Sequence, residues 1–219
     1  MKSFIDTLHS RRWAHLAVSN LRILLGFAFL PSGLKKVLGQ PFTDPQNTGA
    51  FHEFLHAFHA TGFFYPFVGA VQLTIAVLLM TQTFAALGAL MALPVMTTIL
   101  VFCWSTGVVP TAVVTTFMFL GFVALLVWDI DRLLPIIKPG HEPSDSRDEG
   151  QLIDLSLWRA CGAGIVGFYG LACLAYGGVY RPKGMDLGHP AFYVLIVIAL
   201  CPLVTWLVER RSRARSGRA

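Results

Sequence analysis

Six apolar runs alternate with short polar stretches along the chain, and this alternation is its strongest pattern. The first run covers residues 20–38, and the others lie at about residues 62–80, 84–104, 111–128, 157–179 and 191–208. An α-helix needs about 20 predominantly apolar residues to cross a bilayer. The pattern therefore predicts an all-α, polytopic membrane protein with six spans.

The first run carries ionisable residues towards both ends, Arg22 at one and Lys35 with Lys36 at the other. The uncharged stretch Ile23–Leu34 would rise only about 18 Å as a helix, less than the roughly 30 Å of hydrocarbon in a bilayer. Two alternatives follow. Either the cations snorkel to the membrane surfaces, or the helix begins earlier, near Trp13, and holds Arg22 inside a bundle.

Polar stretches divide the chain into segments. Two prolines and a glycine predict a loop at residues 39–50, and a tight turn is expected at residues 81–83. We divide the chain into an amphipathic N-terminal segment (1–19), a four-helix membrane domain (20–134), a polar loop (135–155), two additional spans (156–209) and a basic tail (210–219) that we expect to be disordered.

Composition and charge agree with a membrane protein. Hydrophobic residues make up 55% of the chain and charged residues 13%, against about 25% charged residues in soluble domains. The net charge of +5 comes mostly from the tail. Basic residues next to a membrane span orient helices and contact anionic lipid. The positive charge therefore gives no reason to expect a nucleic-acid partner. The four cysteines lie in apolar runs without a CxxC pair, which speaks against a disulfide framework.

The distribution of Lys and Arg predicts the orientation. If both termini lie on one side, that side holds 13 of the 17 basic residues and the other holds four. Because cytoplasmic segments are enriched in Lys and Arg, we expect both termini in the cytoplasm of a bacterial inner membrane. Residues 39–61 would then face outward.

The motif HExxH occurs at residues 52–56, and another histidine follows three residues later. On a helix His52, His56 and His59 fall on one face. Three imidazoles with Glu53 nearby can hold a metal ion, and in zinc proteases such a Glu is the general base. The alternative is an amphipathic helix at the membrane surface, with a histidine face towards headgroups and a phenylalanine face towards apolar surroundings.

A second motif, GxGxxG at residues 162–167, lies inside an apolar run. A dinucleotide-binding fingerprint needs a preceding strand in a βαβ unit, so we reject that interpretation. Glycines such as Gly162, Gly164, Gly167 and Gly170 instead favour close packing of helices in a membrane.

Two polar clusters are predicted as ligand-binding candidates. Arg22 and Asp129 should lie near the inner ends of their spans and pair, either as a structural clamp or as part of a site for a polar headgroup or a quinone. Asp131 is the alternative partner for Arg22. On the outer side, Lys35, Lys36, Gln72 and Glu53 form a second candidate cluster.

The stretches Arg22–Gly26 and Pro31–Lys36 resemble the first-helix signature of the DoxX-like membrane proteins. The order of the elements up to residue 134 is similar as well. The resemblance implies a four-helix bundle in the cytoplasmic membrane and a role near redox chemistry. One branch resembles the quinone-reducing subunit of a thiosulfate dehydrogenase, and another assists maturation of a periplasmic amine dehydrogenase. Members often carry an acidic residue where this chain has Gln72. A role of the family that depends on that acidic group is therefore not expected for this chain.

From the resemblance we expect a component or accessory subunit of a redox system that interacts with quinone. If it is an enzyme, it would be an oxidoreductase subunit. The expected cofactor is a quinone, or a metal ion at the histidine helix. Expected partners are membrane lipids, a protein of a redox complex, and a second copy of the chain. The alternatives are a transporter-like protein that binds lipid or a small solute without redox chemistry, and a structural subunit of a membrane assembly.

Overall fold

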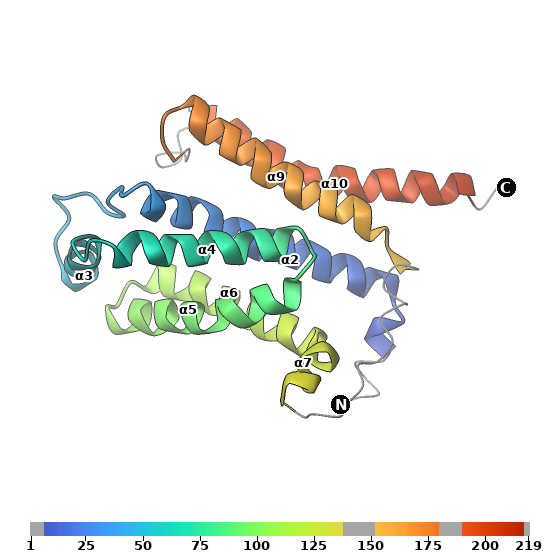
Figure 1. The fold of residues 1–219 in the computed structure, drawn as a ribbon, viewed down its shortest axis with the longest axis horizontal. Coiled ribbons are helices and arrows are strands. Elements are labelled where there is room, and N and C mark those ends of the chain that lie inside the picture. Colours follow the sequence, from blue (N-terminus) through green and yellow to red (C-terminus); the bar gives the residue numbers. More distant parts are fainter. Residues whose placement is uncertain (1–6, 138–151, 180–189, 217–219) are drawn as a thin grey trace.

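A computed structural model of the chain describes residues 7–137, 152–179 and 190–216 (Figure 1). Within these ranges the chain forms helices, turns and loops, with no strand. The principal helices are α2 (Arg12–Val37), α3 (Ala50–His59), α4 (Phe64–Met80), α5 (Ala85–Ser105), α6 (Val109–Trp128), α7 (Ile130–Ile137), α9 (Leu155–Ala175) and α10 (Pro190–Ser216). The all-α architecture is confirmed.

Five helices, namely α2, α5, α6, α9 and α10, are long and apolar enough to cross a membrane. Helix α4 has 17 residues and follows α3 after a break, with a bend of 97° between them. Counting this bent pair as one span gives six crossings, as the apolar runs predict. We call the end of the bundle near Arg12 the inner end and the end near Val37 the outer end.

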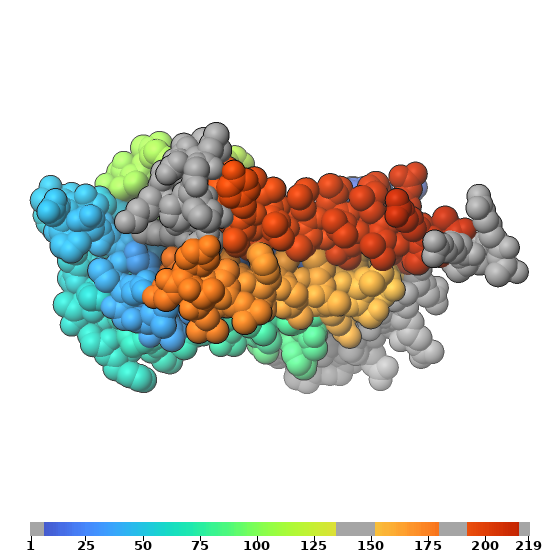
Figure 2. Space-filling model, turned by 90° about the horizontal axis from the view of Figure 1, so that it is seen from above, coloured from blue at the N-terminus to red at the C-terminus, as the bar shows by residue number. Residues whose placement is uncertain are grey.

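The helices form a bundle with an added layer. Helices α2, α4, α5 and α6 make up the bundle, in which α2 packs along α4, and α5 packs against α4 and α6. Helices α9 and α10 lie side by side over it (Figures 1 and 2), where α9 contacts α4 and α2. Helix α3 lies across the outer end of the bundle (Figure 1).

Small residues allow α2 and α4 to approach closely. A Cβ atom added to Gly69 would lie 2.7 Å from the carbonyl oxygen of Gly33 and 2.6 Å from Cβ of Lys36. Gly162 similarly brings α9 onto the carbonyl of Met80, so close packing is confirmed there. The other glycines of that motif, Gly164, Gly167 and Gly170, would meet no atom within 4 Å, and their predicted packing role is wrong within the described monomer.

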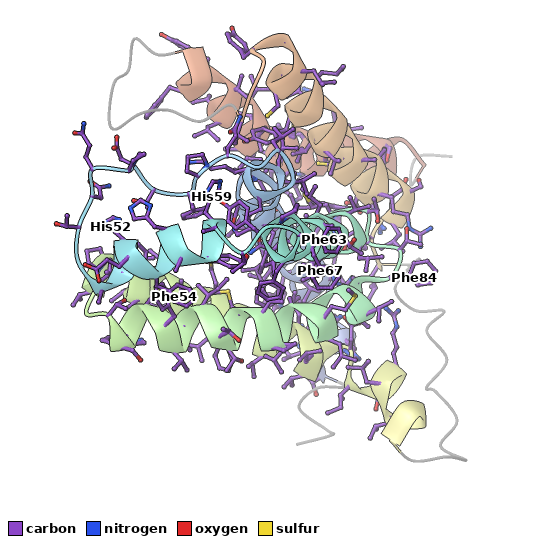
Figure 3. The ribbon with its side chains drawn as sticks, turned by 60° about the vertical axis from the view of Figure 1, so that its left-hand side comes forward. His52, Phe54, His59, Phe63, Phe67 and Phe84 are labelled. Atoms are coloured by element: carbon purple, nitrogen blue, oxygen red, sulfur yellow. The ribbon has the colours of Figure 1, made fainter. Side chains whose placement is uncertain are left out.

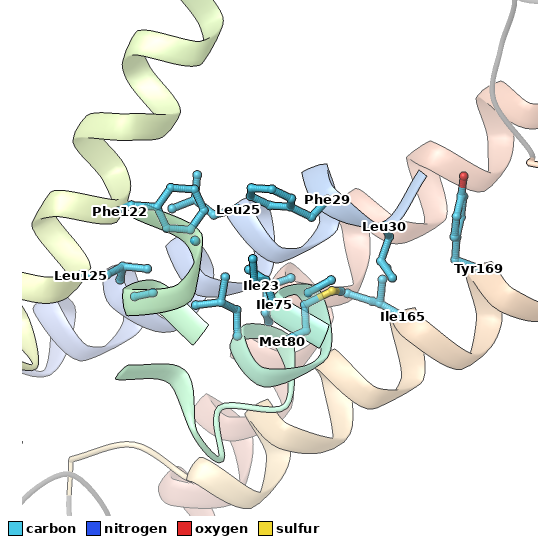
Figure 4. Packing of buried hydrophobic residues seen from close by; sticks show 14 of the residues in the cluster. Ile23, Leu25, Phe29, Leu30, Ile75, Met80, Phe122, Leu125, Ile165 and Tyr169 are labelled. Atoms are coloured by element: carbon cyan, nitrogen blue, oxygen red, sulfur yellow. The ribbon is translucent and has the colours of Figure 1, made fainter. Parts of the chain in front are cut away.

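Apolar side chains from several helices meet in the core (Figure 4). Ile75 and Met80 of α4 are fully buried between α2 and α9, where Ile23 and Ile165 pack against the same cluster. Phe122 of α6 contributes from the other side. All four cysteines are free thiols.

Three boundaries differ from those that the sequence predicts. Helix α2 begins at Arg12, well before residue 20, which confirms the alternative in which Arg22 lies inside a bundle. A short amphipathic helix, α7, follows the fourth span. Helix α10 continues to Ser216, so the expectation of a disordered tail is wrong for residues 210–216. The reason is Glu209, whose buried carboxylate binds the start of this segment to Arg12 and Arg213.

Candidate functional site

The inner cluster centres on the predicted pair of Arg22 and Asp129. Nη2 of Arg22 donates to both carboxylate oxygens of Asp129, at 2.9 and 2.7 Å. The exposed fractions of the two side chains are 3% and 1%. Arg132 also reaches Asp129, at 3.3 Å. Pairing of Arg22 with Asp129, rather than with Asp131, is therefore confirmed.

Gln82 completes this cluster, although the sequence gives no reason to expect it there. Its Oε1 accepts from Nη1 of Arg22 at 3.2 Å, and its Nε2 donates to the carbonyl of Ser19 at 3.2 Å. Gln82 has φ 58° in the turn after α4, and a positive φ is uncommon for a residue other than glycine. The left-handed turn directs a buried amide at the arginine.

Aromatic rings close the inner end beside this pair. Trp128 makes edge contacts with His9 and His15, with ring centroids 4.2 and 5.0 Å apart. Nε2 of His15 lies 2.7 Å from the carbonyl oxygen of His9. The residues before α2 are thereby packed against the C-terminal end of α6.

The outer cluster centres on Lys36, which is 6% exposed. Its Nζ donates to Oγ of Ser32 at 2.8 Å, to the carbonyl of Ser32 at 3.3 Å and to Oε1 of Gln72 at 3.1 Å. The ring of Phe42 lies 4.6 Å from Nζ. Ser32 also donates to Oε1 of Gln72, at 3.2 Å, so α2 and α4 meet through one polar network.

The two lysines at this end have different surroundings. Lys35 is only partly buried, and its Nζ donates to the carbonyl of Phe42 at 3.3 Å. Glu53 is exposed on α3 and, in the described part of the chain, forms no ion pair with Lys35 or Lys36. The predicted contact of Glu53 with these lysines is therefore not formed.

The inner and outer clusters differ in whether their buried cation has a carboxylate partner. Arg22 is buried against a carboxylate, so the inner cluster has its counter-charge built in. Among the described residues no carboxylate lies within 4 Å of Lys36, whose partners are neutral oxygens and an aromatic ring. A buried charge without an opposite charge is costly, and ionisable residues inside membrane bundles mark functional sites by default. The outer cluster is thus the candidate ligand site.

Helix α3 covers the outer end, with its histidines turned towards the loop that precedes it (Figure 3). His52 Nδ1 shares a hydrogen bond of 2.6 Å with Thr43 Oγ1. His56 and His59 donate through Nε2 to the carbonyls of Asn47 and Gly39, at 3.3 and 3.0 Å. The imidazoles fall on one face as predicted, but each bonds a different point of the loop.

The opposite face of α3 is aromatic. Phe54 points towards α5 (Figure 3) and lies 4.5 Å from Phe102, centroid to centroid, and Phe58 lies 5.0 Å from Tyr65. These contacts support the amphipathic-helix interpretation. Within the described ranges no three His, Cys, Asp or Glu side chains are grouped to hold a metal ion, so metal binding at His52, Glu53, His56 and His59 stays a prediction.

A third polar centre, at Glu209 of α10, is not predicted by any pattern in the sequence. Its fully buried carboxylate accepts from Arg12 at 3.3 Å, from Nε1 of Trp158 at 3.1 Å and from Nε of Arg213 at 3.2 Å. It also accepts from the backbone N–H of Asp154 at 3.2 Å. The only signal in the sequence was a lone acidic residue at the start of a basic tail. This centre ties α10 to α9 and to the start of α2.

Together these features describe a multi-pass all-α membrane protein with a buried Arg22–Asp129 pair at the inner end and a buried lysine at the outer end that has no carboxylate partner among the described residues. Residues 17–105 match the family model described as DoxX, so this part of the chain is similar to the DoxX membrane proteins. The match covers most of α2 and the helices up to α5, whereas α6, α9 and α10 lie beyond it. No curated protein and no solved structure matches the chain.

Proposed function

We propose that the protein is a component or accessory subunit of a redox system in the bacterial inner membrane and binds a quinone headgroup at the outer cluster. The observation that carries the proposal is the buried ammonium of Lys36, which lacks a carboxylate partner among the described residues. The DoxX match, which includes Ser32, Lys36 and Gln72, supports it. The excess of Lys and Arg on the side of the termini supports a cytoplasmic location for both of them.

The chemistry of the donor set fits a quinone. A quinone oxygen gains negative charge on reduction, and an ammonium group in a low-dielectric site stabilises such charge. The hydroxyl of Ser32 can donate, and the amide of Gln72 can accept from a hydroquinone. The ring of Phe42, which already lies against both lysines, offers an aromatic face for an aromatic headgroup.

Photolabelling with an azido-quinone tests this proposal. The full-length protein in lipid nanodiscs is irradiated with the probe, and labelled peptides are located by mass spectrometry. We expect labelling around Phe42 and the outer end of α2. Lys36→Gln should lower it about tenfold or more, because a hydrogen bond to a charged group is worth roughly 1.5–3 kcal/mol.

Lys35→Gln is the matched control. It removes the same charge one residue away, from a side chain that contacts Phe42 but neither Ser32 nor Gln72, so it should lower labelling much less than Lys36→Gln does. Equal labelling of Lys36→Gln and the wild type would overturn the proposal. Labelling confined to another part of the chain would do the same.

A further inference from the structure

An apolar groove separates α2 from α10. It has a volume of about 750 Å³ and is lined on α2 by residues from Ala17 to Phe27 and on α10 by residues from Leu195 to Trp206. Because Arg12 contacts Glu209, the two helices run antiparallel and the end at Ala17 and Trp206 is the inner end. Volumes of about 300–1,000 Å³ are usual for ligand pockets.

The groove lies in the apolar part of two membrane-spanning helices. Leu24 and Leu203, which line it, are 67% and 50% exposed. Asn20 adds a polar side chain near the inner end, and its Nδ2 donates to the carbonyl of Leu16. A long apolar chain that enters such a groove remains in apolar surroundings along most of its length.

Arginine side chains gather at the inner end of the groove in the part of the chain that the structure describes. Arg12 and Arg213 share the carboxylate of Glu209, and the carboxylate of Asp154 accepts hydrogen bonds from Ser156 and Leu157. Arg210 is exposed, lies over the ring of Trp206 at 5.6 Å, and has no carboxylate within 4 Å in the described ranges. Among the described residues, a guanidinium without a paired carboxylate, that of Arg210, thus stands next to Trp206, which lines the groove.

We infer that this groove binds an anionic phospholipid, with an acyl chain between α2 and α10 and the phosphate at Arg210. Arginine presents several N–H donors to phosphate oxygens, and basic pockets between membrane helices bind anionic headgroups. The charge at the inner end favours this occupant over an uncharged quinone tail. It also disfavours the same basic surface of a second copy, because like charges repel.

Native mass spectrometry of the delipidated full-length protein tests the inference. The probes are phosphatidylglycerol and phosphatidylcholine with identical palmitoyl and oleoyl chains. We expect phosphatidylglycerol to be retained several-fold more than phosphatidylcholine. Arg210→Gln should remove this preference, whereas Arg211→Gln, which neutralises the next arginine, should preserve it.

The chain-binding part is tested separately with Ala199→Phe, which fills the groove from α10. This variant should lower retention of both lipids without changing the helical circular dichroism spectrum. Equal retention of the two lipids by the wild type would overturn the inference, as would an unchanged preference in Arg210→Gln. A dimer that excludes lipid from the groove would overturn it in favour of a second copy.

Lipid binding in the groove can be tested separately from quinone binding at the outer cluster. Azido-quinone labelling near Lys36 should be the same in Ala199→Phe and in the wild type. If instead a short-chain quinone displaces phosphatidylglycerol and labels α10, the groove is a quinone site and the lipid inference fails.

Discussion

Arg22 and Asp129 are 107 positions apart in the sequence, yet Nη2 of the arginine lies 2.7 Å from Oδ2 of the aspartate. Their contact joins the first helix of the bundle to the residue that follows α6. Since both side chains are almost completely buried, the pair excludes water and its charges cancel locally. Lys36, by contrast, is buried on the same helix with neutral partners only, in the part of the chain that the structure describes. Helix α2 therefore holds the Arg22–Asp129 clamp near its middle and the candidate ligand site near its C-terminal end.

Breaking the clamp should strongly destabilise the protein. Removing one partner of a buried pair leaves an uncompensated charge and costs about 3–5 kcal/mol. We expect Arg22→Ala and Asp129→Ala each to lower the free energy of unfolding by about this amount. Equilibrium unfolding of the purified protein in mixed detergent micelles measures it.

Two further variants distinguish loss of the Arg22–Asp129 contact from loss of a charge in general. Asp131→Ala removes a nearby carboxylate that does not pair with Arg22, and it should cost less than about 1 kcal/mol. Replacing the pair by apolar residues, as in Arg22→Met with Asp129→Leu, should recover most of the loss, because such replacements are often neutral or stabilising. A double variant as unstable as the sum of both single variants would contradict the clamp.

The Arg22–Asp129 pair was predictable because opposite charges at matched depth in apolar helices have few other partners. Gln82 was not, since its role depends on a left-handed turn that places its amide under Arg22. The role of Glu209 depends on the approach of α9 to α10, which supplies Trp158 and the N–H of Asp154. No local pattern in the sequence encodes these contacts between distant segments.

The histidine helix shows the same limit. Helical periodicity correctly placed His52, His56 and His59 on one face, and it placed the phenylalanines elsewhere on the circumference. The partners of the imidazoles are atoms of Gly39, Thr43 and Asn47. Their positions follow from how the loop folds over α3, which periodicity does not describe.

Close contact between α2 and α4 should make Gly69 intolerant of a side chain. A methyl group there would collide with the carbonyl oxygen of Gly33 and with Cβ of Lys36. Neither of these atoms can move away unless the backbone of α2 shifts. We expect Gly69→Ala to lower the free energy of unfolding by about 1–3 kcal/mol, as overpacking does. Gly164→Ala is the control, because open space surrounds that position. It should be neutral or stabilise α9 by up to about 1 kcal/mol.

Asp154 caps the N-terminus of α9, and this cap should make stability depend on pH. Its side chain accepts from Oγ of Ser156 and from the N–H groups of Ser156 and Leu157. The hydrogen bond from Ser156, the largest cause, lowers the pKa of the Asp154 carboxyl below its usual 3.8. Because the folded-state pKa is the lower one, the stabilisation is complete above about pH 4 and is lost as the pH falls through the folded-state value.

Two substitutions at Asp154 test the cap. Asp154→Ala should cost about 0.5–2 kcal/mol at neutral pH. Asp154→Asn caps almost equally well but does not titrate, so the wild type should lose stability relative to it as the pH falls below about 4. Thermal unfolding in detergent as a function of pH measures both effects. Parallel pH profiles of the wild type and Asp154→Asn would contradict this role.

The metal hypothesis for α3 predicts that any metal retained by the purified protein is lost from the triple variant of His52, His56 and His59 to alanine. Binding would have to replace the three hydrogen bonds that the imidazoles make to the loop. Ligation needs neutral imidazole, so metal content should fall when the solution is acidified. Metal analysis per mole of protein decides the question, and equal, negligible content in both proteins rejects the hypothesis.

The orientation in the membrane gives the last prediction. With 13 basic residues on the side of the termini and four on the other, the loop after α2 should face outward and the turn after α4 inward. Asp44 and Thr83 are exposed residues of these two segments, so each can be replaced by cysteine without disturbing the core. A membrane-impermeant maleimide applied to intact spheroplasts should label Asp44→Cys, and it should label Thr83→Cys only after the membrane is opened. The wild type gives the background of its four thiols, of which Cys103 and Cys173 are buried. Labelling of Thr83→Cys in sealed cells would reverse the orientation and place Lys36 on the cytoplasmic side.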